Sequence, residues 1–198
     1  MLTIHRVLGV RLVADHPDEE RTDTGHAVVV DGRRFAAIGP YEELYAAYGD
    51  RARVREWAGL LTPGRYEPDA AALLDAAYWP DPREADALGT EPLTGAALDA
   101  LDMTATRWGA SARRGVQRLL ARGTTVLAGP FTRPEVRTAV ERSGIRWYEG
   151  TPGAPVTPRP RVLTPSGVAD FAVFAGEKGD GPCLVTALDG RLVYRGRV

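Results

Sequence analysis

Side chains able to do acid–base chemistry stand close together after the turn Pro63-Gly64. They are Arg65, Glu67 and Asp69. Two carboxylates could act as acid and base if burial raised the pKa of one of them, and Arg65 would complete such a metal-free site. Asp69 also precedes an Ala-rich run, and this position favours its interpretation as the N-cap of a helix.

Other reactive side chains occur in two places along the chain. The loop from Asp15 to His26 holds His16 and several carboxylates. A metal could bind there, but runs of surface charge are usually solvated, which favours a solvated loop. Cys183 is the only cysteine, and it precedes an apolar strand pattern. Because no histidine is near it to activate a nucleophile, we predict a buried structural thiol.

Aromatic side chains gather in the middle of the chain. If this region leaves an open face, they would line a ligand pocket or a protein interface. The other interpretation is that they fill a small core. A truncated parallel sheet must have its faces and edges covered, and self-association as a homodimer is one way to cover them. These candidate ligand or interface residues are Tyr66, Tyr78, Trp79, Trp108 and Trp147.

Composition excludes several classes of protein. The chain has 198 residues, of which 44% are hydrophobic and 26% charged, with a formal net charge of -1. This balance argues against a dedicated nucleic-acid binder, and no stretch approaches the roughly 20 apolar residues of a membrane span. A single cysteine excludes an intramolecular disulfide and permits a cytosolic setting. We expect a soluble, cytoplasmic bacterial protein with neither nucleic acid nor membrane as a partner.

Both ends of the chain have the pattern of β-structure. Apolar and polar residues alternate over residues 2–7, as they do in a half-buried strand. Asp31-Gly32 and Asp189-Gly190 each separate two apolar runs. Asp-Gly between such runs is the strongest short signal for a hairpin, because both residues tolerate positive φ.

The middle of the chain has a different pattern. A helix is predicted over residues 104–121, with apolar side chains on one side and arginines on the other. A short buried strand follows at 124–128. Thr132 and Glu135 then form a capping-box pattern that opens another helix. The alternation of helices and strands indicates βα units with parallel pairing.

These hairpins and turns resemble those of the amidohydrolase superfamily, in particular imidazolonepropionase-like proteins. In that family the two chain ends form a composite β-sandwich, and a metal-dependent (β/α)8 barrel is inserted between them. The segments that carry the resemblance are VVVDGRRFAAIGP (28–40), LTPG (61–64), GTTV (123–126), GVADFAVF (167–174) and DGRLVYRGR (189–197).

The resemblance also implies a His-x-His metal pair after the Pro-Gly turn, and there this chain departs from the family. Asp69 and Ala71 stand at the two positions, and no histidine follows His26. A hydrolytic zinc needs about three His, Glu or Asp ligands, and Ala71 can supply none. The region 64–159 is also far shorter than the roughly 250 residues of a full barrel. We therefore predict no intact metal site and no cofactor.

Together these patterns predict a mixed α+β fold. Residues 1–63 and 160–198 would form a composite β-sandwich, and residues 64–159 a truncated α/β insert, partly TIM-barrel-like. The Pro-rich segment 150–160 would link the two. The predicted function is that of a catalytically degenerate amidohydrolase-like protein that binds a small ligand or a protein partner. The alternative, implied by the resemblance, is a hydrolase acting on a non-peptide C–N bond of a cyclic amide or amidine.

Overall fold

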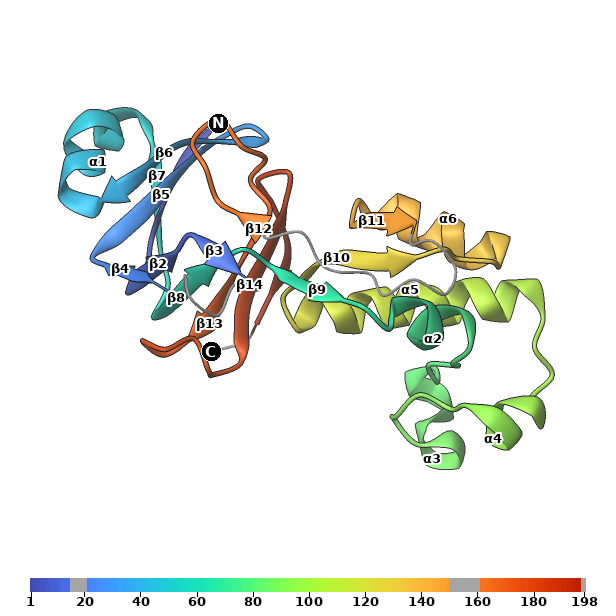
Figure 1. The fold of residues 1–198 in the computed structure, drawn as a ribbon. Helices are drawn as coiled ribbons and strands as arrows, with labels where there is room; N and C mark the ends of the chain where they lie inside the picture. The colour runs from blue at the N-terminus through green and yellow to red at the C-terminus, as the bar shows by residue number, and fades with distance from the viewer. Residues whose placement is uncertain (15–20, 150–160, 197–198) are drawn as a thin grey trace. The chain divides into compact units, whose positions relative to one another are not determined.

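The computed structural model describes residues 1–14, 21–149 and 161–196 (Figure 1). The first part of the predicted acidic loop, residues 15–20, and the predicted linker 150–160 lie outside the described residues. The fold is mixed α/β with several sheets, which confirms the predicted class, and the described residues form no closed barrel. The chain divides into two compact units: Met1–Arg65 with Leu120–Thr125 and Thr157–Val198, and Tyr66–Leu119 with Val126–Val156.

Four strands and a helix make up the first sheet and the layer on one of its faces: β1 (Leu2–Arg6), β5 (His26–Asp31), β6 (Arg34–Pro40), α1 (Tyr41–Tyr48) and β7 (Arg53–Glu56). The strand order is β6-β5-β1-β7, with β7 parallel to β1. The β5–β6 hairpin turns at Gly32, whose φ is 57°, as the Asp-Gly signal predicts. Leu44 of α1 packs against Ile4 and Val29 on this face of the sheet.

A second sheet of the same unit has six strands: β2 (Gly9–Arg11), β4 (Thr22–Thr24), β8 (Gly59–Thr62), β13 (Phe171–Ala175), β14 (Cys183–Leu188) and β15 (Arg191–Arg195). Their order is β15-β14-β13-β8-β2-β4, so strands from the two ends of the chain pair at β13 and β8. The β14–β15 hairpin turns at Asp189 and Gly190, with φ values of 51° and 71°. A short ladder joins β3 (Val13–Ala14) to β12 (Arg161–Val162).

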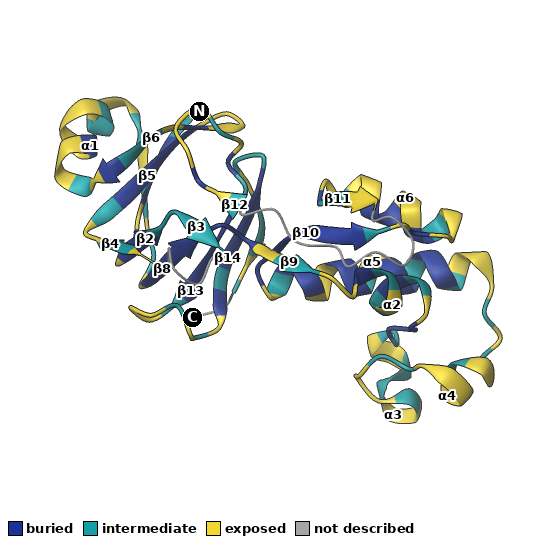
Figure 2. Ribbon diagram, in the orientation of Figure 1, coloured by how far each residue is buried: buried dark blue, intermediate teal, exposed yellow. Residues whose placement is uncertain are grey.

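The two sheets of the first unit share one apolar core (Figure 2). Val28 and Phe35 contribute to it from the four-stranded sheet, and Leu61, Phe171 and Val185 from the six-stranded sheet. All five side chains are at most 1% exposed. Since burial of apolar area is the main driving force of folding, this core sets the position of every strand around it.

A third sheet has the order β11-β10-β9, in which β10 and β11 are parallel, as predicted for βα units. Its strands and helices are β9 (Arg65–Glu67), α5 (Ala105–Ala121), β10 (Thr124–Gly129), α6 (Pro134–Ser143) and β11 (Arg146–Glu149). α6 buries Val136 and Val140 and ends at Gly144, whose left-handed φ of 76° stops the helix.

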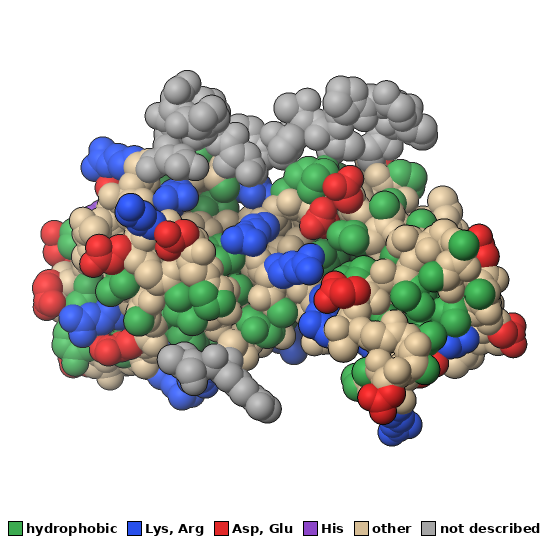
Figure 3. Space-filling model, turned by 90° about the horizontal axis from the view of Figure 1, so that it is seen from below, with side chains coloured by type: hydrophobic (Ala, Val, Ile, Leu, Met, Phe, Trp, Pro, Cys, Tyr) green, Lys and Arg blue, Asp and Glu red, His purple; other side chains and the backbone are tan. Residues whose placement is uncertain are grey.

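Short helices fill the stretch between β9 and α5. They are α2 (Ala70–Asp75), η3 (Pro82–Glu84), α3 (Ala85–Leu88) and α4 (Gly95–Asp99), and η2 (Gly49–Arg51) lies in the first unit. None of the helices in the described part of the chain has the length and apolar character that crossing a membrane requires. On the face drawn in Figure 3, basic and acidic side chains lie interspersed among apolar ones.

Candidate functional site

The predicted acid–base residues follow the turn after β8. Glu67 and Asp69 lie side by side, since the Asp69 N–H donates to Glu67 Oε1 at 3.1 Å. Asp69 precedes α2, but it is exposed and its side chain makes no capping hydrogen bond. Arg65 belongs to the first unit, where its guanidinium lies 4.4 Å from the centre of the Phe174 ring. Glu67 and Asp69 therefore lie next to each other, whereas the Arg65 side chain packs against Phe174.

The residues at the positions of the family's metal ligands do not fit a hydrolytic metal. Ala71 has no ligating atom, and the exposed carboxylate of Asp69 would have to act with further ligands. Within residues 1–14, 21–149 and 161–196, no three His, Cys, Asp or Glu side chains are placed to hold a metal ion together. In the described part of the predicted acidic loop, His26 Nδ1 lies 4.0 Å from Asp23 Oδ2.

Cys183 and His5 are both buried in the first unit. Burial raises the pKa of the Cys183 thiol, whose Sγ lies 3.3 Å from the Val185 carbonyl oxygen. His5 is 1% exposed, and its Nδ1 accepts a hydrogen bond from Trp57 Nε1 at 3.1 Å. Burial, with a smaller contribution from the charge of Arg55, lowers the pKa of His5 to about 4. Both groups are therefore neutral at pH 7 and packed among strands.

The five aromatic candidates divide into three environments. Tyr78 and Trp79 are buried together at the start of a polar network. Trp108 is also buried, with the guanidinium of Arg133 3.9 Å from its ring centre. Trp147 is partly buried, edge-to-face with Phe131 at 5.5 Å, and the remaining candidate, Tyr66, is likewise partly buried. Of the five, Tyr78 is the one that lines a described cleft.

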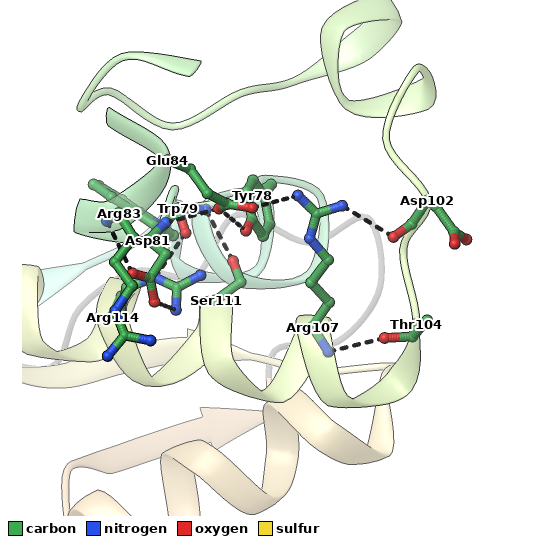
Figure 4. A network of polar contacts seen from close by, with 10 residues as sticks. All are labelled: Tyr78, Trp79, Asp81, Arg83, Glu84, Asp102, Thr104, Arg107, Ser111 and Arg114. Carbon is green, nitrogen blue, oxygen red and sulfur yellow. Dashed lines mark hydrogen bonds and ion pairs between the residues drawn. The ribbon is translucent and has the colours of Figure 1, made fainter. Parts of the chain in front are cut away.

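The polar network is centred on the carboxylate of Glu84, the last residue of η3, six residues after Tyr78. The Tyr78 hydroxyl donates to Glu84 Oε2 at 2.5 Å, and Arg107 Nη2 donates to Oε1 at 2.8 Å. The guanidinium of Arg107 also stacks 4.8 Å from the Tyr78 ring centre and donates to the Asp102 carbonyl oxygen. Figure 4 shows Arg107 reaching from α5 toward these loop residues.

A second set of contacts from α5 fixes the backbone at Trp79. Arg114 Nε donates to the Trp79 carbonyl oxygen at 2.8 Å, and the Trp79 N–H donates to Ser111 Oγ at 2.9 Å. Gly115 leaves room for the indole, since a Cβ there would lie 2.7 Å from Trp79 Nε1. Arg107, Ser111 and Arg114 lie about one and two turns apart, so they share one face of the helix.

A cleft of about 360 Å³ opens beside this network, wholly within the second unit. Its lining includes Tyr78, Arg83, Glu84, Arg107 and Arg114. Burial, then the hydrogen bond to Glu84, raise the pKa of Tyr78, while the hydrogen bond from Tyr78 contributes most to lowering the pKa of Glu84. At neutral pH the cleft therefore presents the neutral phenol of Tyr78, the ionised carboxylate of Glu84 and three guanidinium groups. The side chain of Asp81 also lines the cleft and pairs with Arg114 at 3.4 Å.

Sequence reasoning missed Glu84, Arg107, Ser111 and Arg114. The helical pattern of residues 104–121 places the arginines opposite the apolar side chains and names no partner for them. In the structure, Arg107 binds Glu84 of η3 and Arg114 binds the Trp79 carbonyl oxygen. The only available signal was the spacing of Arg107, Ser111 and Arg114 on one helix face. That signal does not name the partner segment, so the network could not be inferred without the fold.

No family model and no curated protein matches the sequence. Guanine deaminase from E. coli is similar in fold, with a TM-score of 0.51 and 15% identity over 76% of this chain and 36% of that chain. Atrazine chlorohydrolase from Arthrobacter aurescens TC1, solved with zinc, gives a TM-score of 0.49 and 17% identity, with coverages of 75% and 35%.

By their names, the two neighbours are a deaminase and a chlorohydrolase. The chain spans about a third of the length of either protein. At 15% identity, the likeness to guanine deaminase shows a shared fold and nothing about residues or reaction.

Proposed function

We propose that this chain is an amidohydrolase-like protein that binds a small ligand or a partner without metal-dependent hydrolysis. One observation carries the proposal: the metal positions implied by the resemblance hold Ala71 and an exposed Asp69. A metal-activated water needs a cation held by several ligands in a fixed geometry. At these two positions the chain supplies one carboxylate, that of Asp69, and Oε1 of the neighbouring Glu67 accepts a hydrogen bond from the Asp69 N–H.

The proposal treats the architecture as a reduced form of the family's fold. In it, the four- and six-stranded sheets are the composite β-sandwich, and β9, β10 and β11 are what remains of the barrel. The shared core of the two sheets supports this, since Val28 and Phe171 come from segments near opposite ends of the chain. The fold shared with guanine deaminase supports the same ancestry.

The cleft beside Tyr78 is the ligand site that we infer. Its walls are held by hydrogen bonds from α5, so the guanidinium of Arg107 and the Tyr78 ring are fixed in place before a ligand arrives. A preformed site loses less entropy on binding than a flexible one. The volume, about 360 Å³, lies within the range of small-molecule pockets.

The first experiment separates binding from turnover. Protein purified without chelator is analysed for metal content and molar mass, then incubated with guanine or hydantoin while ammonia release and ring opening are followed. We expect no stoichiometric metal, no turnover with or without added zinc, and a rise in Tm with a compound that fits the cleft. We expect Arg107→Gln to abolish the rise in Tm. Arg118→Gln, a substitution at an exposed position of the same helix, should leave the rise unchanged. Stoichiometric zinc together with turnover would overturn the proposal.

The second candidate is a hydrolase or deaminase acting on a C–N bond of a cyclic amide or amidine. The fold shared with E. coli guanine deaminase favours it. In this chain such an enzyme would use Glu67 and Asp69, the neighbouring carboxylates. Turnover that disappears in Asp69→Ala and persists in Glu91→Ala, a change at another exposed carboxylate, would establish this candidate in place of the first.

A further inference from the structure

Two edge strands of the first unit carry a cluster of arginines that we call the edge cluster: Arg53, Arg55 and Arg195. β7, at the edge of the four-stranded sheet, holds the first two, and β15, at the edge of the six-stranded sheet, holds the third. Arg55 is partly buried, and the other two are exposed. The cluster belongs to the first unit, whereas the cleft beside Tyr78 belongs to the second unit.

The register places the two arginines of β7 on the side that faces the six-stranded sheet. β7 is parallel to β1, with Arg55 beside His5 and Arg53 beside Thr3. Neighbouring residues of paired strands project from the same face of a sheet. The His5 ring lies 5.0 Å from the ring of Phe171, which belongs to the core between the sheets. Arg53 and Arg55 therefore project toward that core's edge.

The third arginine approaches from the opposite sheet. Arg195 pairs with Val185, a member of the same core, so its side chain projects from the inner face of β15. Its guanidinium lies 5.5 Å from the ring centre of Trp57, which directly follows β7 and packs against the core. Arg195 of one sheet therefore approaches the end of β7, the strand of the other sheet that carries Arg53 and Arg55.

Nothing in the described chain neutralises these charges. None of the three guanidinium groups forms a hydrogen bond or an ion pair with another described residue. Glu56, the acidic residue of β7, projects from the other face and binds Arg6 at 3.1 Å. Arg107 and Arg114, by contrast, each have a carboxylate partner. Burial first, then the charges of Arg53 and Arg195, lower the pKa of Arg55.

We propose that the edge cluster binds a phosphoryl group, as free phosphate or as a small phosphomonoester. Guanidinium groups form paired charge-assisted hydrogen bonds with phosphate oxygens. A phosphate dianion would offset most of the charge of three arginines, whereas a carboxylate would offset only one. The Trp57 ring beside Arg195 offers an apolar surface for the organic part of an ester.

The test is calorimetric titration of the full chain with inorganic phosphate and with phenyl phosphate, at constant ionic strength set by sodium chloride. Acetate, a monovalent oxyanion, is titrated in parallel. We expect saturable binding of phosphate with a stoichiometry of one and little binding of acetate. Tighter binding of phenyl phosphate assigns the site to a phosphomonoester, and equal binding assigns it to free phosphate.

Two variants and a matched control locate the site. Arg55→Gln and Arg195→Gln should each raise the Kd of phosphate by about tenfold or more, because each removes a charge-assisted contact. Arg6→Gln removes the same charge from the outer face of the same sheet and should leave the Kd unchanged. Circular dichroism checks that each variant is folded. Equal weakening by Arg6→Gln, or a phosphate response that never saturates, would overturn the proposal and indicate general charge screening.

Discussion

The two units hold their key side chains by different means. In the first unit, alternation along paired strands aligns Val28, Phe171 and Val185 in one core, and the ladder of backbone hydrogen bonds fixes them. In the second unit, Tyr78 donates a hydrogen bond to Glu84, which also accepts one from Arg107. The Trp79 carbonyl oxygen accepts a hydrogen bond from Arg114. A sheet core tolerates the loss of one polar contact, whereas the network depends on a few of them.

The largest effect is expected from the core between the sheets. Phe171 is 0% exposed and lies 6.0 Å from the ring of Phe35. Phe171→Ala should lower the free energy of unfolding by about 3–5 kcal/mol, because it removes buried apolar area and leaves a cavity. Urea denaturation measures the loss, and hydrogen exchange should place it in both sheets of the first unit. Val168→Ala, at a position 38% exposed, is the control; an equal loss there would contradict the assignment of the core.

The same core should make the first unit sensitive to acid. The pKa of His5 is lowered from 6.5 to about 4, so the unfolded chain binds the proton more tightly than the folded one. The stability contributed by neutral His5 is complete above pH 6.5 and decreases as the pH falls toward 4. The loss should be about 3 kcal/mol.

Denaturation at several pH values measures this dependence. His5→Phe, which keeps an aromatic ring beside Phe171, should remove most of it between pH 6.5 and 4. His26→Gln should leave it in place, since the His26 side chain is 28% exposed and that of His5 is buried. A variant without His5 that keeps the full dependence would show that another group titrates.

These two regions also explain which features were predictable from sequence. The hairpins at Asp31-Gly32 and Asp189-Gly190 depend on residues that adjoin one another, so their signal is local. Burial of Cys183 follows from the apolar pattern of its own strand. The pair Glu84 and Arg107 is different, because the partners come from a loop and a helix whose approach depends on the fold. Charge patterns alone gave no sign of that approach.

A smaller effect is expected from the polar network of the second unit. Tyr78→Phe removes the hydroxyl that donates to Glu84 while keeping the buried ring. It should lower the free energy of unfolding by about 1–2 kcal/mol. A hydrogen bond to a charged group stabilises a protein more than a neutral one does, but Glu84 keeps its other donors after the substitution. Tyr45→Phe, on an exposed side chain of α1, should change nothing measurable. If the two variants behave alike, the network does not stabilise the second unit.

The smallest effect concerns the start of α6, where sequence and structure disagree. The sequence predicts a capping box of Thr132 and Glu135, but α6 has no capping hydrogen bond from its own N-cap residue. Asp75 supplies the acceptor instead: its Oδ2 accepts from the Thr132 N–H at 2.6 Å and from the Thr132 hydroxyl at 3.0 Å. The capping-box hypothesis was wrong because Asp75, a residue distant in sequence, accepts the hydrogen bonds of Thr132.

The two hypotheses for the start of α6 predict opposite effects of the same two substitutions on stability. With Asp75 as the acceptor, Asp75→Ala should lower the free energy of unfolding by about 1 kcal/mol, the usual cost of a lost helix cap, and Glu135→Ala should have almost no effect. A capping box would give the reverse order. Hydrogen exchange at the first turn of α6 measures both variants in one experiment. If Asp75→Ala alone lowers protection from exchange, the start of α6 is capped by a residue distant in sequence. Most helices are instead capped by a residue next to their first turn.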